Sequence, residues 1–312
     1  MTMRIAVGVD IGGTAVKMGL AGEDGTLLSV REFPTRVEGG GENILPDVAG
    51  MLPRMLADLA VPMEQIIGIG LAVPGPVMSD GTVNRCLNLG WGRIRPQDTL
   101  QALTGLPVTT LNDGSAAALG EMWLGSARDC RDFVMLTLGT GVGGGIVVDG
   151  RPLTGADGSA GEVGHILVDL EEKEACVCGN RGCLEQYASA TGLVRTYRQA
   201  IRSGAEGPAG EHITAKDISQ AARAGSPAAL WALERCAAAL GRGMAILATI
   251  LNPQRFILGG GMAQSGDLLI VQAEGTFRQH AFHAASETPI VLAQLGNAAA
   301  VMGCAYAALH HM

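Results

Sequence analysis

The chain has 312 residues, of which 47% are hydrophobic and 17% are charged, and its net charge at pH 7 is −8. This length accommodates two ordinary domains or one large domain, and the hydrophobic share excludes a disordered chain. The excess of acidic residues argues against a surface that binds nucleic acid or an anionic membrane, because both need a positive footprint. We therefore expect a small-molecule ligand, with neither nucleic acid nor membrane as a partner.

Three further features indicate a cytoplasmic protein. No apolar run reaches the roughly 18 uninterrupted residues of a transmembrane helix, and residues 1–10 are typical of a strand rather than of a signal peptide. The seven cysteines, an odd number, fit a reducing compartment better than a disulfide framework.

The first part of the chain predicts a sheet that begins as an antiparallel meander. Three short β-rich runs are separated by glycine-containing turns, and a βαβ element follows them. A further short strand then leads into an alanine-rich helix. The predicted strands cover residues 4–9, 15–20, 26–33, 66–73 and 108–111, and the predicted helices cover residues 43–59 and 115–124.

The second part of the chain repeats the opening pattern and then becomes mostly helical. A strand over residues 133–138, a glycine-rich loop over 139–145 and a strand over 146–148 match the pattern of residues 5–20, which we interpret as a weak internal duplication. One later strand is predicted over residues 255–258. The later predicted helices lie near residues 193–202, 214–224, 228–251, 267–282 and 297–310.

The first glycine-rich loop joins two strands in the sequence Asp10-Ile-Gly-Gly-Thr-Ala-Val-Lys17. An acid ends the strand, two glycines leave backbone N–H groups free to face an anion, and a hydroxyl and an ammonium follow. This arrangement suits a phosphate. An ordinary Gly-Gly hairpin would explain the loop equally well if it stood alone.

The second loop, residues 139–145, contains the string G-x-G-x-x-G. We reject a Rossmann interpretation, because a strand and not a helix follows the loop. A Walker loop is excluded as well, because the dipeptide Gly-Lys does not occur. A third glycine-rich strand end lies at residues 258–262. Three such loops favour the phosphates of a nucleotide.

Asn112 and Asp113 lie between a predicted strand and the alanine-rich helix. Both residue types are preferred helix N-caps, which is the simpler explanation of the pair. A carboxylate at such a junction would also be held rigidly, and it could accept the proton of an attacking hydroxyl in phosphoryl transfer.

His165, Cys176, Cys178 and Cys183 place four metal-ligand side chains within 19 residues. The spacing predicts a tetrahedral Cys3His zinc site, with a redox switch as the main alternative. The remaining cysteines, Cys86, Cys130, Cys236 and Cys304, are isolated and are interpreted as packing residues.

Glu162 and Glu185 flank this cluster. Both could be solvated surface charges, the usual fate of glutamate. A metal-bound loop would instead fix them, and the second nitrogen of His165 could then meet either a protein group or a substrate hydroxyl. The three residues together are a candidate polyol-binding set.

Taken together, these motifs resemble the sugar kinases of the ROK family (repressor, open reading frame, kinase) in the actin-like ATPase superfamily. The resemblance covers almost the whole chain. It implies an α/β fold of two actin-like (ribonuclease H-like) domains with an interdomain cleft. By its pattern, residues 1–113 and about 298–312 form the N-terminal domain, and residues 114–297 form the C-terminal domain with the zinc-binding loop.

The resemblance implies a role for each motif. Asp113 corresponds to the catalytic base, and Asp10 to the residue that places Mg²⁺. The expected substrate-binding residues are Asn88, Asn112, Asp113, Glu162, His165 and Glu185. The residues expected to bind ATP are Asp10, Gly12, Gly13, Thr14, Lys17, Gly139, Thr140, Gly141, Gly143, Gly259, Gly260 and Gly261.

The expected activity is that of an ATP-dependent hexose kinase that phosphorylates the C6 hydroxyl of a sugar, with glucose as the leading candidate. Fructose, allose or N-acetylmannosamine is the alternative substrate. A sugar-sensing regulator is a remote alternative, disfavoured because nine residues precede Asp10 and the chain is acidic. The alanine-rich, helical second half suggests a homodimer or homotetramer.

Overall fold

A computed structural model describes residues 3–208, 210, 212–263 and 267–312. The chain divides into two compact units. The first unit contains residues 1–131, 145–161 and 294–312, and the second contains residues 132–144 and 162–293. Among the helices of the described residues, none is long and apolar enough to cross a membrane.

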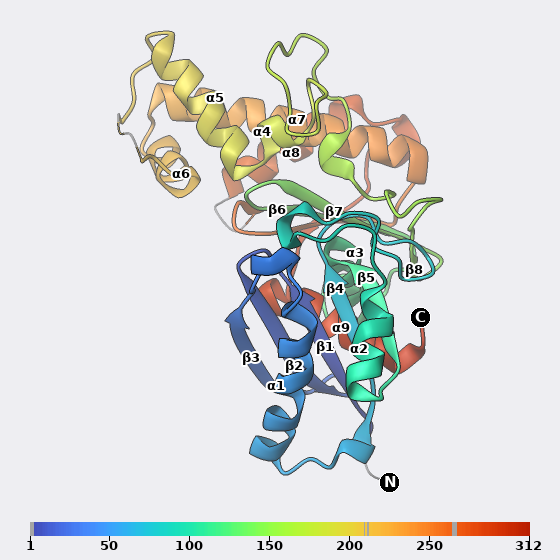
Figure 1. The fold of residues 1–312 in the computed structure, drawn as a ribbon. Coiled ribbons are helices and arrows are strands. Elements are labelled where there is room, and N and C mark those ends of the chain that lie inside the picture. Colours follow the sequence, from blue (N-terminus) through green and yellow to red (C-terminus); the bar gives the residue numbers. More distant parts are fainter. Residues whose placement is uncertain (1–2, 209, 211, 264–266) are drawn as a thin grey trace. The chain divides into compact units, whose positions relative to one another are not determined.

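The first unit is built on a five-stranded sheet in the order β3-β2-β1-β4-β5 (Figure 1). The pairs β1–β2 and β2–β3 are antiparallel, which confirms the predicted meander, and the pairs β1–β4 and β4–β5 are parallel. The strands are β1 (Ile5–Ile11), β2 (Ala15–Gly22), β3 (Leu27–Pro34), β4 (Ile66–Val73) and β5 (Val108–Asn112).

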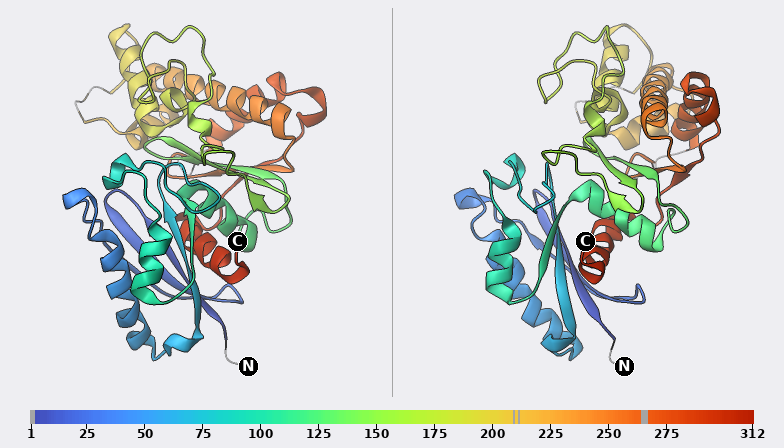
Figure 2. Two further views of the ribbon diagram at one scale, coloured as in Figure 1. Left: turned by 45° about the vertical axis from the view of Figure 1, so that its right-hand side comes forward. Right: turned by 90° about the vertical axis from the view of Figure 1, so that its right-hand side faces the viewer.

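Two pairs of helices cover this sheet, one on each face (Figure 2). The pair α1 (Ile44–Leu59) and α2 (Pro96–Thr104) packs its apolar residues into the main hydrophobic core on one face. The pair α3 (Asp113–Leu124) and α9 (Ala299–His310) covers the other. Glycines on β1 and β4 let α9 approach closely, because a Cβ at Gly8 or Gly70 would collide with its backbone.

The second sheet has the order β10-β9-β6-β7-β8. Strand β9 pairs in parallel with both β6 and β10. The strands are β6 (Phe133–Leu138), β7 (Val142–Val148), β8 (Arg151–Pro152), β9 (Arg255–Gly259) and β10 (Ile290–Leu292).

The helices of the second unit pack around the long helix α7, which contacts α4, α5, α6 and α8. Its alanines and leucines are mostly buried. The helices are α4 (Glu185–Ala188), α5 (Ala190–Arg202), α6 (Ala215–Arg223), α7 (Pro227–Leu251) and α8 (Asp267–His280).

The structure confirms the α/β fold and most predicted elements, with some differences. The strand after Leu138 begins at Val142, so residues 143–145 belong to β7 and not to a loop. A Cβ at Gly145 would collide with the carbonyl of Gly114, which explains a glycine inside a strand. Helices α2 and α4 and strands β8 and β10 were not predicted; the two strands have two and three residues, too few for a clear alternation.

The compact units also follow different boundaries from the predicted division at residue 113. Helix α3 packs against α9 within the first unit, and the segment 145–161 belongs to that unit too. These units are compact regions of the chain, whereas the prediction concerns two domains of actin-like fold. The predicted domain division therefore stays a prediction.

Candidate active site

Asn112 ends β5 and caps α3, as the sequence predicts. Its Oδ1 accepts a hydrogen bond of 3.0 Å from the N–H of Ser115. Its Nδ2 donates to the carbonyl of Gly75 at 3.2 Å and to Oδ1 of Asp113 at 3.0 Å. One side chain therefore starts the helix, ties it to the turn after β4 and orients the next carboxylate.

Asp113 is held at the start of α3 with access to solvent. Its Oδ1 accepts the N–H of Gly114 at 2.8 Å in addition to the Asn112 amide. Surrounding protein atoms desolvate the carboxylate and raise its pKa above 3.8, while these hydrogen bonds lower it in part. A carboxylate with a raised pKa and a fixed direction is suited to accept a proton.

Asp10 lies near the end of β1, and Lys17 is its cross-strand partner on β2. The pKa of Asp10 is raised to about 6, mainly by burial and then by the charge of Asp113, which together outweigh the lowering by Lys17. Two carboxylates that oppose each other's ionisation create a negative potential, which a divalent cation would relieve.

The first glycine-rich loop is a hairpin between β1 and β2, closed by the N–H of Gly12 donating to Ala15 at 2.9 Å. Thr35, which sequence reasoning missed, fixes the hairpin from the end of β3. Its hydroxyl donates to the carbonyl of Gly12 at 2.6 Å, and its N–H donates to the carbonyl of Thr14 at 3.0 Å. Gly13 and Thr14 are exposed at the tip.

Asn88 lies in a short 3-10 turn, Leu87–Leu89, beside this hairpin. A Cβ built on Gly13 would lie 3.7 Å from the Cβ of Asn88, in ordinary contact. The turn is held by Trp91, whose N–H donates to the carbonyl of Cys86 and whose indole N–H donates to that of Gly41. The exposed Asn88 side chain is therefore carried on an anchored segment.

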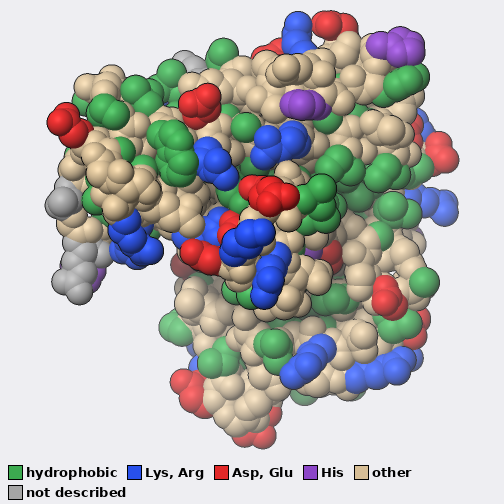
Figure 3. Space-filling model, turned by 90° about the horizontal axis from the view of Figure 1, so that it is seen from above, with side chains coloured by type: hydrophobic (Ala, Val, Ile, Leu, Met, Phe, Trp, Pro, Cys, Tyr) green, Lys and Arg blue, Asp and Glu red, His purple; other side chains and the backbone are tan. Residues whose placement is uncertain are grey.

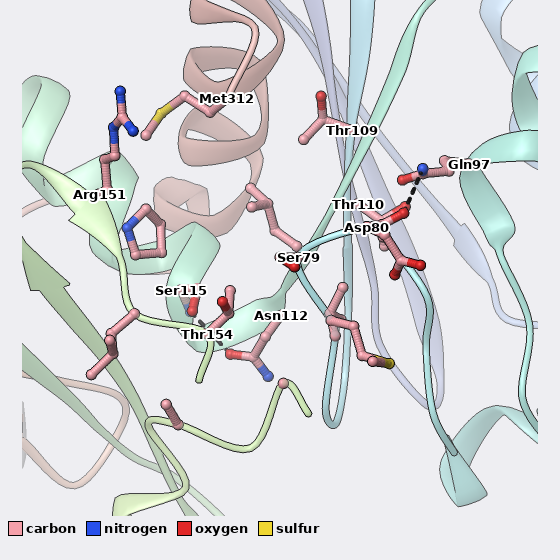
Figure 4. A pocket seen from close by; sticks show the side chains of 18 of the residues that line it. Ser79, Asp80, Gln97, Thr109, Thr110, Asn112, Ser115, Arg151, Thr154 and Met312 are labelled. Carbon is pink, nitrogen blue, oxygen red and sulfur yellow. Dashed lines mark hydrogen bonds between the residues drawn. The ribbon is translucent and has the colours of Figure 1, made fainter. Parts of the chain in front are cut away.

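A cavity of 740 Å³ in the first unit follows the edge strand β5 and reaches Asn112 and Ser115 (Figure 4). Its lining is rich in hydroxyl and amide groups, among them Thr109, Thr154 and Gln97. Asn112 thus contacts both this cavity and the Asp113 carboxylate. The sequence did not predict the cavity, because its walls come from segments far apart in the chain.

In the second unit, a pocket of 620 Å³ brings together Gly139, Thr140 and Gly261 of two predicted phosphate loops. Lys216 and Arg223 of α6 line the same pocket. A second pocket of 430 Å³ shares Thr140 and also contains basic residues of α5, Arg198 and Arg202. Glycine N–H groups beside basic side chains form a suitable site for a polyphosphate.

The basic residues of α5 and α6 were missed in the sequence. Their only signal is the polar face of each helix, which is equally typical of a solvated surface. Two other glycines of the third loop have structural reasons for lacking a side chain or lie at its start. Gly259 ends β9. Gly260 adopts a φ of +85°, and a Cβ there would collide with the backbone of Leu138.

Glu185 is tied to the second glycine-rich loop. Its Oε2 accepts a hydrogen bond of 3.0 Å from the N–H of Val142, and a Cβ at Gly141 would collide with the same oxygen. Gly141 is therefore needed to let the carboxylate approach. Thr191 fixes the loop from α5 by donating to the carbonyl of Thr140 at 2.8 Å.

His165 and the three clustered cysteines come together in the second unit, as the sequence predicts. Their ligand atoms all lie within 4.8 Å of one another. Cys176 Sγ is 3.8 Å from His165 Nδ1, and Cys178 Sγ is 3.6 Å from Cys183 Sγ. In a tetrahedral site with Zn–S bonds of about 2.3 Å, ligand atoms are about 3.8 Å apart, so the donor set fits zinc.

The segment 165–183, here called the cysteine loop, is held by the protein around it. The hydroxyl of Tyr187 lies 2.8 Å from Asp169 and 2.7 Å from Glu172. Arg195 forms ion pairs with Glu172 at 2.6 Å and with Glu174 at 3.2 Å. Arg195 holds the pKa of Glu172 well below its ordinary value, at about 2.

The other four cysteines are buried, as predicted for packing residues.

Glu162 is exposed and precedes the 3-10 turn Val163–His165, and its carbonyl accepts the N–H of His165 at 3.1 Å. It therefore belongs to the second unit with His165 and Glu185, whereas Asn88, Asn112 and Asp113 belong to the first. Asn112 and Asp113 are hydrogen-bonded to each other, and Glu162 and His165 lie in one turn. Their convergence on one sugar stays a prediction.

On the face seen in Figure 3, acidic and basic side chains are interspersed, with apolar side chains between them. The absence of a nucleic-acid partner stays a prediction.

Comparisons with known proteins place these features in one family. The model of the ROK family matches residues 6–311. A glucokinase of Halalkalibacterium halodurans is 39% identical, over 97% of this chain and 94% of that protein. A solved ROK family glucokinase from Streptomyces griseus, in complex with glucose and AMPPNP, is 32% identical with a TM-score of 0.78, covering 98% of this chain and 99% of that one. A ROK hexokinase from Thermus thermophilus is 31% identical with a TM-score of 0.85, covering 98% of each chain. The chain belongs to the ROK family.

Proposed function

We propose that the protein is an ATP-dependent hexokinase that phosphorylates the C6 hydroxyl of glucose. The observation that carries the proposal is the Asp113 carboxylate, fixed at the start of α3 by Asn112 and Gly114 with a raised pKa. Two relatives support the substrates: the glucokinase at 39% identity, and the glucokinase structure that holds glucose and AMPPNP.

In the proposed reaction, the C6 oxygen of the sugar attacks the γ-phosphorus in line. Asp113 takes the hydroxyl proton as the new O–P bond forms, and the bond to the β–γ bridging oxygen breaks to release ADP. The role of Asn112 and Gly114 is to hold the carboxylate in position, because misplacement of a reacting group by 1 Å can slow a reaction by about two orders of magnitude.

We assign the nucleotide to the pocket formed by Gly139, Thr140 and Gly261 in the second unit, with the hairpin at Gly12 and Gly13 as a second group of phosphate donors. Backbone N–H groups and basic side chains are the donors that phosphate oxygens prefer. Asp10 is the residue that would hold Mg²⁺, whose charge neutralises the phosphates when it is bound. Its buried position next to another carboxylate supports this role.

We assign the sugar hydroxyls to six residues. Ionised carboxylates accept two or more hydroxyl hydrogens, and amide and imidazole groups supply donors, so the set suits a polyol. The residues are Asn88, Asn112, Asp113, Glu162, His165 and Glu185.

We further propose that His165, Cys176, Cys178 and Cys183 hold one structural Zn²⁺. The support is the tetrahedral spacing of the donor atoms and their chemistry, because thiolate and imidazole ligands are typical of zinc. Burial and the neighbouring thiols raise the pKa of Cys183 to about 12, which opposes its ionisation; a bound cation would stabilise the thiolate form that ligates metal.

The test is a substrate panel with Mg-ATP. Glucose, fructose, mannose, allose and N-acetylmannosamine are compared by kcat/KM, and the product is identified by phosphorus NMR. We expect glucose to have the highest value and the product to be glucose 6-phosphate. A higher value for another hexose would keep the kinase and replace the substrate, whereas no phosphorylation of any sugar would refute the proposal.

A further inference from the structure

Glu121 is a fully buried carboxylate in α3 with no place in the mechanism above; 0% of its surface is exposed. Burying an ionised carboxylate is costly unless hydrogen bonds compensate for the lost water. Glu121 has three backbone donors. Its Oε1 accepts the N–H of Gln294 at 2.9 Å and that of Leu295 at 2.8 Å, and its Oε2 accepts the N–H of Ser126 at 2.8 Å.

Two of these three donors lie where the chain passes from one compact unit to the other. The chain returns from the second unit to the first between Ala293 and Gln294, so Glu121 holds the first two residues after this crossing. Neither of these residues belongs to a strand or helix. Without the carboxylate, their two N–H groups would lose these acceptors.

Electrostatics explains why an acid occupies this site. A 3-10 turn, Gly296–Ala298, and then α9 follow directly, and their cap residues Leu295 and Ala298 have no polar side chain to cap them. The N–H groups at the start of a helix carry partial positive charge, which a carboxylate stabilises. Glu121 accepts the N–H groups of the two residues that directly precede the turn, so its carboxylate lies near the positive end of the turn.

The two helices joined in this way form a closely packed pair. A Cβ at Gly120 would collide with the backbone of Ala299, and a Cβ at Gly303 with that of Ala116. Helix α3 also begins with Asp113, eight residues or about 12 Å before Glu121. The base, Glu121 and the crossing thus belong to one packed body.

We propose that Glu121 is a positioning residue, which fixes the return crossing at Gln294–Leu295 to the helix that carries the catalytic base. Through this connection, it keeps Asp113 in a constant position with respect to the point where the chain enters from the second unit. The kinetic part of the proposal rests on the proposed kinase function, whereas the structural part does not.

The structural part is tested in the wild-type protein by hydrogen exchange. The amides of Gln294 and Leu295 should be as strongly protected as those of α3, although they lie outside regular structure. Exchange as fast as in an open loop would overturn the proposal without any bearing on the kinase function.

The kinetic part is tested with Glu121→Gln, which replaces one accepting oxygen by an NH2 group. We expect faster exchange at Gln294 and Leu295 and a kcat lower by about tenfold or more, because a misplaced base slows the reaction. Affinity for AMPPNP should be unchanged, since the hydrogen-bond partners of Glu121 are not among the residues assigned to the nucleotide. A merely structural role would lower thermal stability and leave kcat of the folded fraction unchanged, which would contradict the proposal.

A second variant displaces the carboxylate without altering its charge. A Cβ at Gly125 would collide with Oε2 of Glu121, so Gly125→Ala should reproduce the kinetic effect of Glu121→Gln. Gly275→Ala is the matched control, because a Cβ at that position in α8 meets no atom within 4 Å. Gln294→Ala is the second control, because it keeps the N–H. Equal kcat values for Gly125→Ala and Gly275→Ala would refute the proposal.

Discussion

At the scale of single residues, Asn112 combines a structural and a chemical function. The two explanations of the Asn112–Asp113 pair that the sequence left open, helix cap and functional group, are compatible. The Oδ1 of Asn112 caps α3, and its Nδ2 stabilises the ionised form of Asp113. The residue types predicted the cap, but they could not predict the environment that raises the pKa of Asp113.

The amide of Asn112 can be tested separately from the cap. Asn112→Asp and Asn112→Ser both retain a good capping side chain, so the free energy of unfolding should fall by only about 1 kcal/mol, the cost of the lost bond to the Gly75 carbonyl. Both lose the donor to Asp113, and the aspartate also adds a like charge, which raises the pKa of Asp113.

The measurement is the pH dependence of kcat/KM for glucose. A base is active when deprotonated, so activity falls as the pH drops through its pKa, and the acid limb should move to higher pH in both variants. The shift should be larger in Asn112→Asp. If the acid limb of the pH profile does not move in either variant, the group whose titration limits kcat/KM at low pH is not Asp113.

The Asp10 carboxylate should lower the free energy of unfolding at neutral pH in the absence of Mg²⁺. Its pKa is about 6 in the folded protein and 3.8 in the unfolded chain. The folded state therefore binds the proton of Asp10 more tightly than the unfolded chain does, which stabilises the folded state at low pH. This stabilisation is lost as the pH rises from about 4 to about 6. Asp10→Asn should unfold at a higher temperature than the wild type at pH 7, with lower activity.

The difference in melting temperature between Asp10→Asn and the wild type should shrink as the pH falls toward 4. Thermal unfolding of both proteins at several pH values, without divalent cations, measures it. A difference that does not depend on pH would contradict the assigned pKa.

At the scale of elements, the cysteine loop is the clearest case of a site predicted from spacing. Its four ligand residues are close in sequence, so the pattern shows directly in the chain. The ion pairs and hydrogen bonds that hold the loop involve Tyr187 and Arg195, which no pattern distinguished. Supporting residues are predictable only after the fold is known.

Removal of the proposed zinc should weaken the fold and the binding of sugar. A chelator should lower the free energy of unfolding by more than about 2 kcal/mol, because binding of a structural metal contributes to folding. The glucose KM should rise as well, if the loop positions His165 toward the substrate. Metal analysis should find one zinc per chain.

The matched control for chelation is Cys178→Ser, which changes an exposed side chain and spares the core. This variant should have lower stability than the wild type and show little further response to the chelator. Loss of stability with an unchanged KM would mean that zinc is purely architectural.

At the scale of the whole molecule, the fold was more predictable than the site. Glycine turns, alternation and helical periodicity predicted β1, β4, β6 and α7 nearly at their observed bounds. These patterns reflect local geometry. The cavity beside β5 and the pocket lined by Lys216 and Arg223 depend on contacts between distant segments, which periodicity does not encode.

The same distinction applies to the predicted sugar site, whose residues come from both units. The sequence resemblance brought these residues together, and the structure adds how each is held within its own unit. The predicted homodimer or homotetramer and the cytoplasmic location stay predictions, since they concern partners and surroundings rather than the fold of one chain.

The most direct test of the account is the kcat of Asp113→Asn for glucose with Mg-ATP. A general base typically contributes a factor of about 10² to 10⁴, and asparagine can accept the same backbone N–H without taking a proton. We predict that kcat falls by at least about 10²-fold in a protein whose melting temperature is no lower than that of the wild type and whose affinity for AMPPNP is unchanged. Phosphorylation of glucose near the wild-type rate by this folded variant would contradict the account.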